Sequence, residues 1–151
     1  MAKKFIESYD PWISVDIPWT PVAKALGNST IAIVTTAGVH HTDQKPFNMK
    51  DPDGDPSYRV LDVRRPLSSL MITHDYYDHS DADKDINIVF PVERLKELEN
   101  EGIIGCLANI HFGLMGHVTG RHIPAIIHKV APTIARNLLD EKVDIVLLTP
   151  G

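Results

Sequence analysis

Three short apolar runs alternate with two helix patterns, and this alternation constrains the fold more than any other feature. The runs are rich in Ile, Val, Leu and Ala and have the length of buried strands, at residues 31–36, 103–110 and 145–148. Pro91 opens an amphipathic pattern that ends near Gly102, and Pro124 opens a second one over residues 125–139. The order strand, helix, strand, helix, strand predicts an α/β fold, with a mostly parallel sheet, flanking helices and a Rossmann-like or flavodoxin-like arrangement.

The remaining segments show weaker periodicity. Residues 1–30 mix aromatic residues with prolines, which predicts an irregular N-terminal arm that packs on the rest of the chain. Residues 42–69 carry four prolines and many aspartates, which predicts a long Asp/Pro-rich loop of a kind that is usually functional. Residues 85–90 offer a further short strand. We expect a single α/β domain over residues 1–151, in which the run at 145–148 is a buried parallel strand.

Composition narrows the class of protein. A chain of 151 residues that is 43 % hydrophobic and 23 % charged fits one globular domain. No apolar run approaches the roughly 20 residues of a membrane span, and no secretory signal is apparent, so we expect a cytoplasmic protein. The net charge of −5 without a basic cluster argues against nucleic acid as partner. The lone Cys106 lies among apolar residues, which predicts a buried, inert thiol.

The segment 72–83 concentrates two histidines and four aspartates. Its spacing imitates the His-x-His-x-Asp-His motif of metallo-β-lactamase-like hydrolases, but Tyr76 stands at the second histidine position, which argues against a metal. Two interpretations stay open. The loop is either a polar turn in which His and Asp cap one another, or a metal-free catalytic loop in which Asp75 or Asp78 orients a histidine.

Residues 51–57 resemble the alternating acidic ligands of a calcium loop. The EF-hand pattern requires Gly at the sixth position and Glu at the twelfth, whereas this segment has Pro56 and Asp62 there. We therefore expect a proline-stiffened turn.

The chain has eight histidines in all, and their placement suggests a polar cavity. His40 and His41 follow the first predicted strand, at the sheet edge where α/β proteins usually bind ligands, and only one of two adjacent side chains is expected to face a pocket. His111 and His117 flank a glycine-containing turn whose backbone N–H groups could receive an anion. His122 and His128 lie at or in a helix, where solvated or hydrogen-bonded histidines are expected.

Four stretches, read together, resemble the selenoprotein B family of glycine, sarcosine, betaine and D-proline reductases, with the selenocysteine-bearing D-proline reductase subunits nearest. They are TTAGVHH at 35–41, PFNM at 46–49, DPDGDPS at 51–57 and HDYYDHSDAD at 74–83. The likeness continues through NIVFP at 87–91, MGH at 115–117 and LTPG at 148–151. It covers nearly the whole chain from Pro18 onward.

The resemblance implies that selenocysteine follows Gly151 directly, then two residues and a cysteine. The chain would thus be the N-terminal part of a longer subunit, inactive alone, ended by termination at a UGA codon or by a break at the nonstandard residue. A selenolate is a stronger nucleophile at neutral pH than a thiol. The implied reaction is reductive ring opening of D-proline to 5-aminovalerate, with glycine, sarcosine or betaine as alternative substrates.

The resemblance also implies partners and roles. The partners are a pyruvoyl-bearing subunit and an electron-donating redox protein, assembled as a hetero-oligomer, and this chain is expected to bind no metal or other cofactor. Candidates for the acid that protonates the leaving amine are His40, His41, Asp78 and His79. Candidates for substrate binding are His74, Asp75 and His117. A non-catalytic binding or assembly module and a metal hydrolase are the alternatives from other classes.

Overall fold

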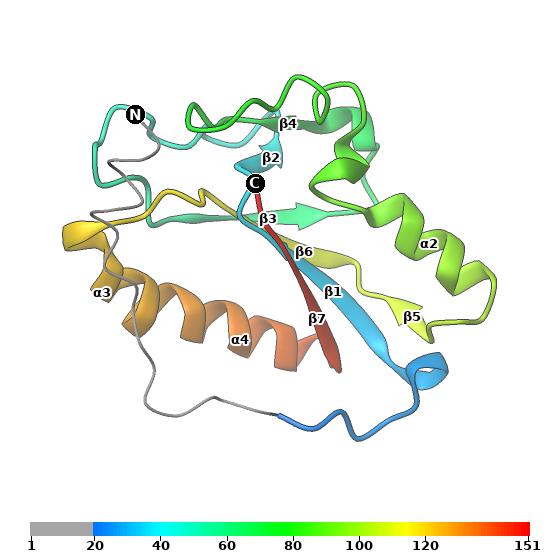
Figure 1. Ribbon diagram of the computed structural model, residues 1–151. Helices are drawn as coiled ribbons and strands as arrows, with labels where there is room; N and C mark the ends of the chain where they lie inside the picture. Colours follow the sequence, from blue (N-terminus) through cyan, green and yellow to red (C-terminus); the bar gives the residue numbers. More distant parts are fainter. Residues whose placement is uncertain (1–19) are drawn as a thin grey trace, which may run out of the picture.

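A five-stranded sheet lies at the centre of the computed structural model, which describes residues 20–151 (Figure 1). Its strands are β1 (Thr30–Thr35), β3 (Tyr58–Asp62), β5 (Cys106–Leu107), β6 (Ile110–Leu114) and β7 (Ile145–Thr149). β1 is the central strand, because it pairs in parallel with β5 and β6 along one edge and with β7 along the other. β3 pairs antiparallel with β6. The expected mostly parallel α/β sheet is confirmed.

Helices cover both faces of this sheet (Figure 1). On one face α2 (Val92–Asn100) packs against Ile31 and Ile33 of β1. On the other a continuous helical segment packs against Ala32 and Phe112, and it consists of α3 (Ile123–Ala125), a π-helical turn (Ile126–Val130) and α4 (Ala131–Asp140). The side chains of β1 thus alternate between two apolar clusters, as a parallel strand buried on both faces requires.

The two helical segments correspond to the helices expected near residues 91–102 and 125–139. The second one widens into its π turn just before Pro132. Pro132 has no N–H to donate to the carbonyl of His128, which disturbs the regular α-helical ladder at that point.

A small second sheet lies beyond the carboxyl ends of the parallel strands. It pairs β2 (Val39–His41) antiparallel with β4 (Leu70–Ile72). Short 3-10 turns complete the connections, at Leu26–Asn28, Leu67–Ser69, Ile86–Ile88 and Gly120–His122. Figure 1 shows the end of β7 directly beside β2, so the two sheets meet at the edge where a ligand site is expected.

Several predictions about the connections were wrong. Residues 42–69 are not a continuous loop, because they contain β3 and a 3-10 turn. Residues 85–90 form a 3-10 turn instead of a strand, since the Asp85 carboxylate accepts the Asn87 N–H and closes the turn. The strand expected over 103–110 is split into β5 and β6. The predicted N-terminal arm lies outside the described residues up to position 19.

The prediction of a buried final strand was also wrong. β7 is parallel, but Val146 and Leu147 are each 38 % exposed and Leu148 is 72 % exposed, because β7 pairs only with β1 within residues 20–151. Cys106 is exposed as well, at the start of the short strand β5. Partial desolvation and the Glu99 carboxylate raise the pKa of its thiol, which agrees with low reactivity. No described helix is long and apolar enough to cross a membrane.

Candidate functional site

The ends of β1 and β7 are fixed side by side. The hydroxyls of Thr35 and Thr149 both donate to the carbonyl of Val89, at 3.0 and 2.7 Å. The Thr149 carbonyl accepts the Thr36 N–H at 2.9 Å. These bonds hold the carboxyl ends of β1 and β7 in fixed relative positions, and a site that is built on rigid elements requires this.

Gly151 lies two residues beyond β7 and is exposed, but it has close neighbours on one side. A Cβ at this position would lie 2.5 Å from Ala37 Cα and 3.1 Å from Tyr77 Cε1. The Tyr77 hydroxyl donates to the Ala37 carbonyl at 3.0 Å. Tyr77 thus contacts both the loop that follows β1, at Ala37, and Gly151, which follows β7.

His74 packs against the other side of this tyrosine. Its ring centroid is 4.8 Å from that of Tyr77, and the side chain is 5 % exposed. Nδ1 accepts the Tyr76 N–H at 3.2 Å, so the proton of the neutral ring is on Nε2. Burial, followed by the nearby His117 and His79, lowers the pKa of His74. His74 therefore presents a neutral N–H donor, and Nε2 has no hydrogen-bond partner within residues 20–151.

His79 lies on the same tyrosine, with ring centroids 5.6 Å apart. Its Nδ1 is 2.8 Å from a carboxylate oxygen of Asp83, and its side chain is 28 % exposed. The carboxylate fixes the ring and favours a proton on Nδ1, which leaves Nε2 available to exchange a proton. His79 and Asp83 form a pair suited to general acid–base work.

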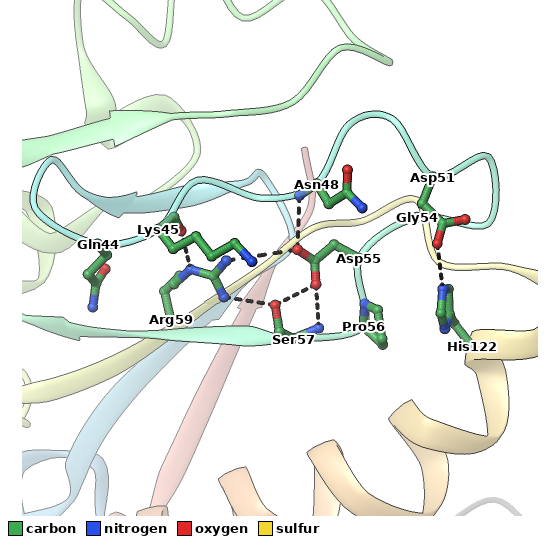
Figure 2. A pocket seen from close by; sticks show the side chains of 10 residues that line it. All are labelled: Gln44, Lys45, Asn48, Asp51, Gly54, Asp55, Pro56, Ser57, Arg59 and His122. Atoms are coloured by element: carbon green, nitrogen blue, oxygen red, sulfur yellow. Dashed lines mark hydrogen bonds and ion pairs between the residues drawn. The ribbon is translucent and has the colours of Figure 1, made fainter.

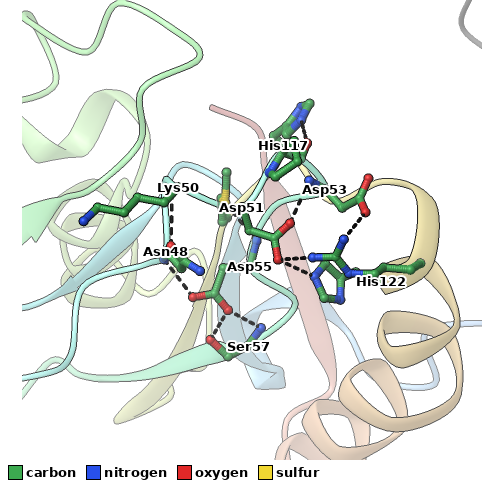
Figure 3. Close-up of polar contacts among 11 residues, drawn as sticks. Asn48, Lys50, Asp51, Asp53, Asp55, Ser57, His117 and His122 are labelled. Atoms are coloured by element: carbon green, nitrogen blue, oxygen red, sulfur yellow. Dashed lines mark hydrogen bonds and ion pairs between the residues drawn. The ribbon is translucent and has the colours of Figure 1, made fainter.

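His117 joins the cluster from the loop after β6. Its ring stacks on Tyr76 at a centroid distance of 4.1 Å, and Nε2 donates to the Pro52 carbonyl at 3.2 Å. Figure 3 shows His117 above the Asp51–Asp53 turn. The distant His117 is thus brought to His74 and His79, which share one segment, through two tyrosines.

The two candidate aspartates differ from these histidines. The Asp78 carboxylate accepts the Ser80 N–H at 3.0 Å, and this bond lowers the pKa of Asp78. An ionised turn-capping carboxylate is a poor proton donor at neutral pH. Asp75 is exposed, and its charge acts on His74, where it opposes the lowering of the pKa.

His40 and His41 are both buried in β2. His40 bonds the His41 carbonyl through Nδ1 and the Thr73 hydroxyl through Nε2, each at 2.8 Å. His41 bonds the Ser69 hydroxyl through Nδ1 at 2.9 Å, and its Nε2 accepts the Asp62 N–H at 3.1 Å. Burial, then the charge of Arg65, lowers the pKa of His41. All four ring nitrogens are occupied within the protein, which is the pattern of structural histidines.

The Asp-rich segment 51–57 forms a turn closed by its own side chains. The Asp51 carboxylate binds His122 at 3.0 Å and also Arg121, and these bonds, with the Asp53 N–H, lower the pKa of Asp51 to about 2. Asp53 binds Arg121 at 2.9 Å (Figure 3). The carboxylates of Asp51 and Asp53 are thus neutralised by ion pairs to the 3-10 turn Gly120–His122. Within residues 20–151 no three metal-ligating side chains converge.

An open pocket of about 660 Å³ lies beside this turn and is lined by Lys45, Asn48 and Arg59 among others (Figure 2). The Arg59 guanidinium lies 4.3 Å over the Phe47 ring and donates to the Lys45 carbonyl at 2.7 Å. Further bonds of Arg59 reach Pro46, Ser57 and Tyr58. Arg59 is therefore committed to holding the loop, and we place the candidate site at the tyrosine–histidine cluster instead.

Tyr76 and Tyr77 were absent from the candidate residues of the sequence. The sequence pattern that could have identified them is the Tyr-Tyr pair inside a His/Asp-rich segment. Aromatic rings between imidazoles can position the imidazoles by packing. Thr35 and Thr149 gave no comparable signal, since threonine is common in strands.

Comparisons with known proteins identify relatives of this chain. The sequence model of the family described as glycine/sarcosine/betaine reductase selenoprotein B matches residues 3–151. D-proline reductase subunit gamma of Acetoanaerobium sticklandii is 43 % identical over 133 residues, which are 88 % of this chain and 53 % of the relative. Glycine reductase complex component B subunit gamma of Carboxydothermus hydrogenoformans is 32 % identical over 137 residues, 88 % of this chain and 30 % of the relative.

A third relative is the sarcosine reductase complex component B subunit beta of Peptoclostridium acidaminophilum, 26 % identical over 152 residues, 98 % of this chain and 34 % of the relative. The chain spans about half the length of the first relative and about a third of the other two. No solved structure gives a significant match.

Proposed function

The chain belongs to the glycine/sarcosine/betaine reductase selenoprotein B family, and from this premise we propose that it serves as a subunit of a D-proline-cleaving reductase complex. Its relatives are subunits of reductase complexes, which supports a reductase role within a hetero-oligomer. D-proline is the proposed substrate because the relative named for that reaction is 43 % identical, against 32 % for the glycine reductase relative.

The observation that carries the proposal is the cluster around Gly151. Tyr77 packs on Gly151, and His74 and His79 pack on Tyr77, all at the carboxyl end of a parallel strand. We place the reactive selenocysteine of the subunit directly after Gly151. An imidazole N–H next to that position can donate a hydrogen bond to the carboxylate of the substrate. A second imidazole can give a proton to the departing amine.

Ring opening of D-proline takes up two electrons and two protons, as the bond between nitrogen and the α-carbon breaks. One proton goes to the leaving nitrogen and one to the carbon. A selenolate, with a pyruvoyl carbonyl on the partner subunit, would supply the nucleophile and the electron sink, and an electron-donating redox protein would supply the electrons.

The residues of this chain have separate roles in the proposal. His79, held by Asp83 through Nδ1, gives the proton from Nε2 to the leaving nitrogen. His74 keeps a neutral ring, and its Nε2–H donates to the substrate carboxylate. His117 holds Tyr76 in place from the opposite loop. His40 and His41 maintain the small sheet beside the site.

The test uses the assembled reductase complex with the full-length subunit and follows 5-aminovalerate formed from D-proline. We expect His79→Gln to lower kcat by about 100-fold, the lower range for loss of a general acid. His128→Gln is the matched control, because His128 is an exposed histidine on the distant helical segment. A kcat of His79→Gln within twofold of the unmodified complex would contradict the role of His79.

Substrate class is tested in the same preparation with glycine, sarcosine and betaine. We expect turnover with D-proline alone. Turnover of one of the other three in its place would assign the subunit to a sister complex. No turnover of any of the four by the loaded complex would favour an assembly module.

A further inference from the structure

The edge of the sheet formed by β7 is apolar on both faces. Val146 and Leu148 pair in register with Ala32 and Val34, so they face the side covered by α4. Leu147 pairs with Ile33 and faces the side covered by α2. All three of these β7 side chains are nevertheless exposed, Leu148 by 72 %. The helices that bury β1 therefore leave these three β7 side chains partly uncovered.

The opposite edge of the sheet is built differently. β3 carries the charged Arg59 and Asp62, and its outer backbone groups are bonded by side chains, since the Val60 carbonyl accepts the Gln44 amide and the Asp62 N–H donates to His41. β7 has the sequence Ile-Val-Leu-Leu-Thr and carries no charge. Strands of parallel sheets with such sequences are normally covered on both faces and paired on both edges. The composition of β7 is thus that of an interior strand.

The lengths of the relatives indicate what covers this edge. The D-proline reductase relative is matched over only 53 % of its length, and the glycine reductase relative over 30 %. Each of these subunits therefore contains about as much further polypeptide as the matched part, or more. An additional segment of that size can hold several strands and helices.

We propose that the remainder of the subunit docks on β7: one of its β-strands pairs along the edge that has no partner strand within residues 20–151, and its apolar side chains cover Val146, Leu147 and Leu148. This assigns an interaction surface whose occupant is the rest of the same subunit. It does not depend on the identity of the substrate. It also places the docked part near Gly151, because the proposed strand runs beside β7, which ends two residues before Gly151.

The experiment measures docking directly. The 151-residue chain is mixed with a polypeptide comprising the part of Acetoanaerobium sticklandii D-proline reductase subunit gamma that lies outside the matched region. Binding is followed by calorimetry, and amide hydrogen exchange is followed at residues 145–149. We expect a complex in which these amides exchange at least tenfold more slowly than in the chain alone.

Matched substitutions identify the surface. Val146→Lys is expected to weaken binding at least tenfold. Val60→Lys is the control, because Val60 lies on the opposite edge strand and is 37 % exposed, against 38 % for Val146. Equal effects of both changes would overturn the assignment to β7.

Other occupants give distinct results, and each overturns the proposal. Protection of residues 145–149 that rises with the concentration of the chain alone, together with a doubled mass in light scattering, would indicate a second copy. Protection in the monomer that disappears on removal of residues 1–19 would indicate the N-terminal segment. Absence of both binding and protection would show that β7 is a free edge.

Discussion

The Tyr77 hydroxyl donates to the carbonyl of Ala37 at 3.0 Å, across 40 residues of sequence. This bond ties the His/Asp-rich segment to the loop that leaves β1. The same ring packs on Gly151 and on the rings of His74 and His79. One side chain therefore sets the relative positions of the strand end and both imidazoles.

Tyr77→Phe is expected to destabilise the protein by about 1 kcal/mol, the usual net contribution of one hydrogen bond. The measurement is urea unfolding. Tyr58→Phe is the control, because the Tyr58 ring packs on Phe112 and its hydroxyl has no hydrogen-bond partner within residues 20–151. In the reductase complex Tyr77→Phe should lower kcat more than it raises KM, since it displaces the proposed acid. A loss of stability equal to that of Tyr58→Phe would contradict the prediction.

Gly54 is a second point where packing fixes the site. It has a φ of +84°, and a Cβ there would lie within 3 Å of the His117 carbonyl group. Gly54→Ala is expected to cost well over the 1 to 2 kcal/mol of a left-handed backbone alone, because the 51–55 loop must move away from His117.

Gly102 provides the comparison for Gly54. It has a φ of +71°, and a Cβ there would meet no atom within 4 Å, so Gly102→Ala should cost about 1 kcal/mol. Thermal unfolding of the two variants measures the difference. Similar melting temperatures would show that the contact with His117 is not tight.

The sequence predicted those features that depend on local periodicity. The strand at 31–36, both helices and the parallel strand at 145–148 all follow from apolar spacing and from prolines at helix starts. β3 was missed because it is half-exposed and lies between prolines and aspartates, so that its pairing with β6 decides its conformation.

The candidate site was only partly predictable, for a physical reason. The spacing of His74, His79 and His117 contains no information on the rings between them, whereas the structure connects them through Tyr76 and Tyr77. His40 and His41 have the expected position at a strand end. Their role depends on long-range bonds to Asp62, Ser69 and Thr73, which no local pattern encodes.

His41→Ala is expected to act on stability. It leaves the partly buried Asp62 N–H without its acceptor, which costs about 1 kcal/mol, and it also opens a cavity at the buried His41 position. Denaturant unfolding measures the loss. Its kcat in the reductase complex, measured below the unfolding temperature, should stay within a few-fold of the unmodified complex. A 100-fold loss of kcat in a stably folded variant would instead indicate that His41 is a proton donor.

The buried His111 is expected to make the free energy of unfolding depend on pH. Its Nδ1 accepts the Ile33 N–H and its Nε2 donates to the Ala108 carbonyl, both at 2.8 Å, and burial lowers its pKa to about 4. The unfolded chain binds a proton near pH 6.5, whereas the folded chain does not. Stability is therefore full above pH 6.5 and falls as the pH drops toward 4, by about 3 kcal/mol for this residue.

Urea unfolding between pH 7.5 and 4.5 checks the His111 prediction. The Asp51 and Asp62 carboxyls, whose pKa is lowered to about 2, lose their contributions only as the pH falls below the unfolded value of 3.8. His111→Gln should make the profile between pH 6.5 and 4.5 less steep, with the remaining slope due to His41 and His74, whose pKa values are also lowered, whereas His128→Gln should leave it unchanged. An unaltered slope in His111→Gln would assign the pH dependence to other groups.

Asp83 offers the sharpest separation between a proton-transfer role for His79 and a purely structural one. Asp83→Asn keeps the size and a hydrogen-bond acceptor for Nδ1 but removes the negative charge beside the ring. We expect kcat for D-proline to fall about tenfold with little change in KM, because the charge matters most when the proton is transferred. Asp81→Asn is the matched control, since the Asp81 carboxylate pairs with the exposed Lys84 alone among the described residues 20–151. If His79 merely caps a turn, both variants will retain full kcat.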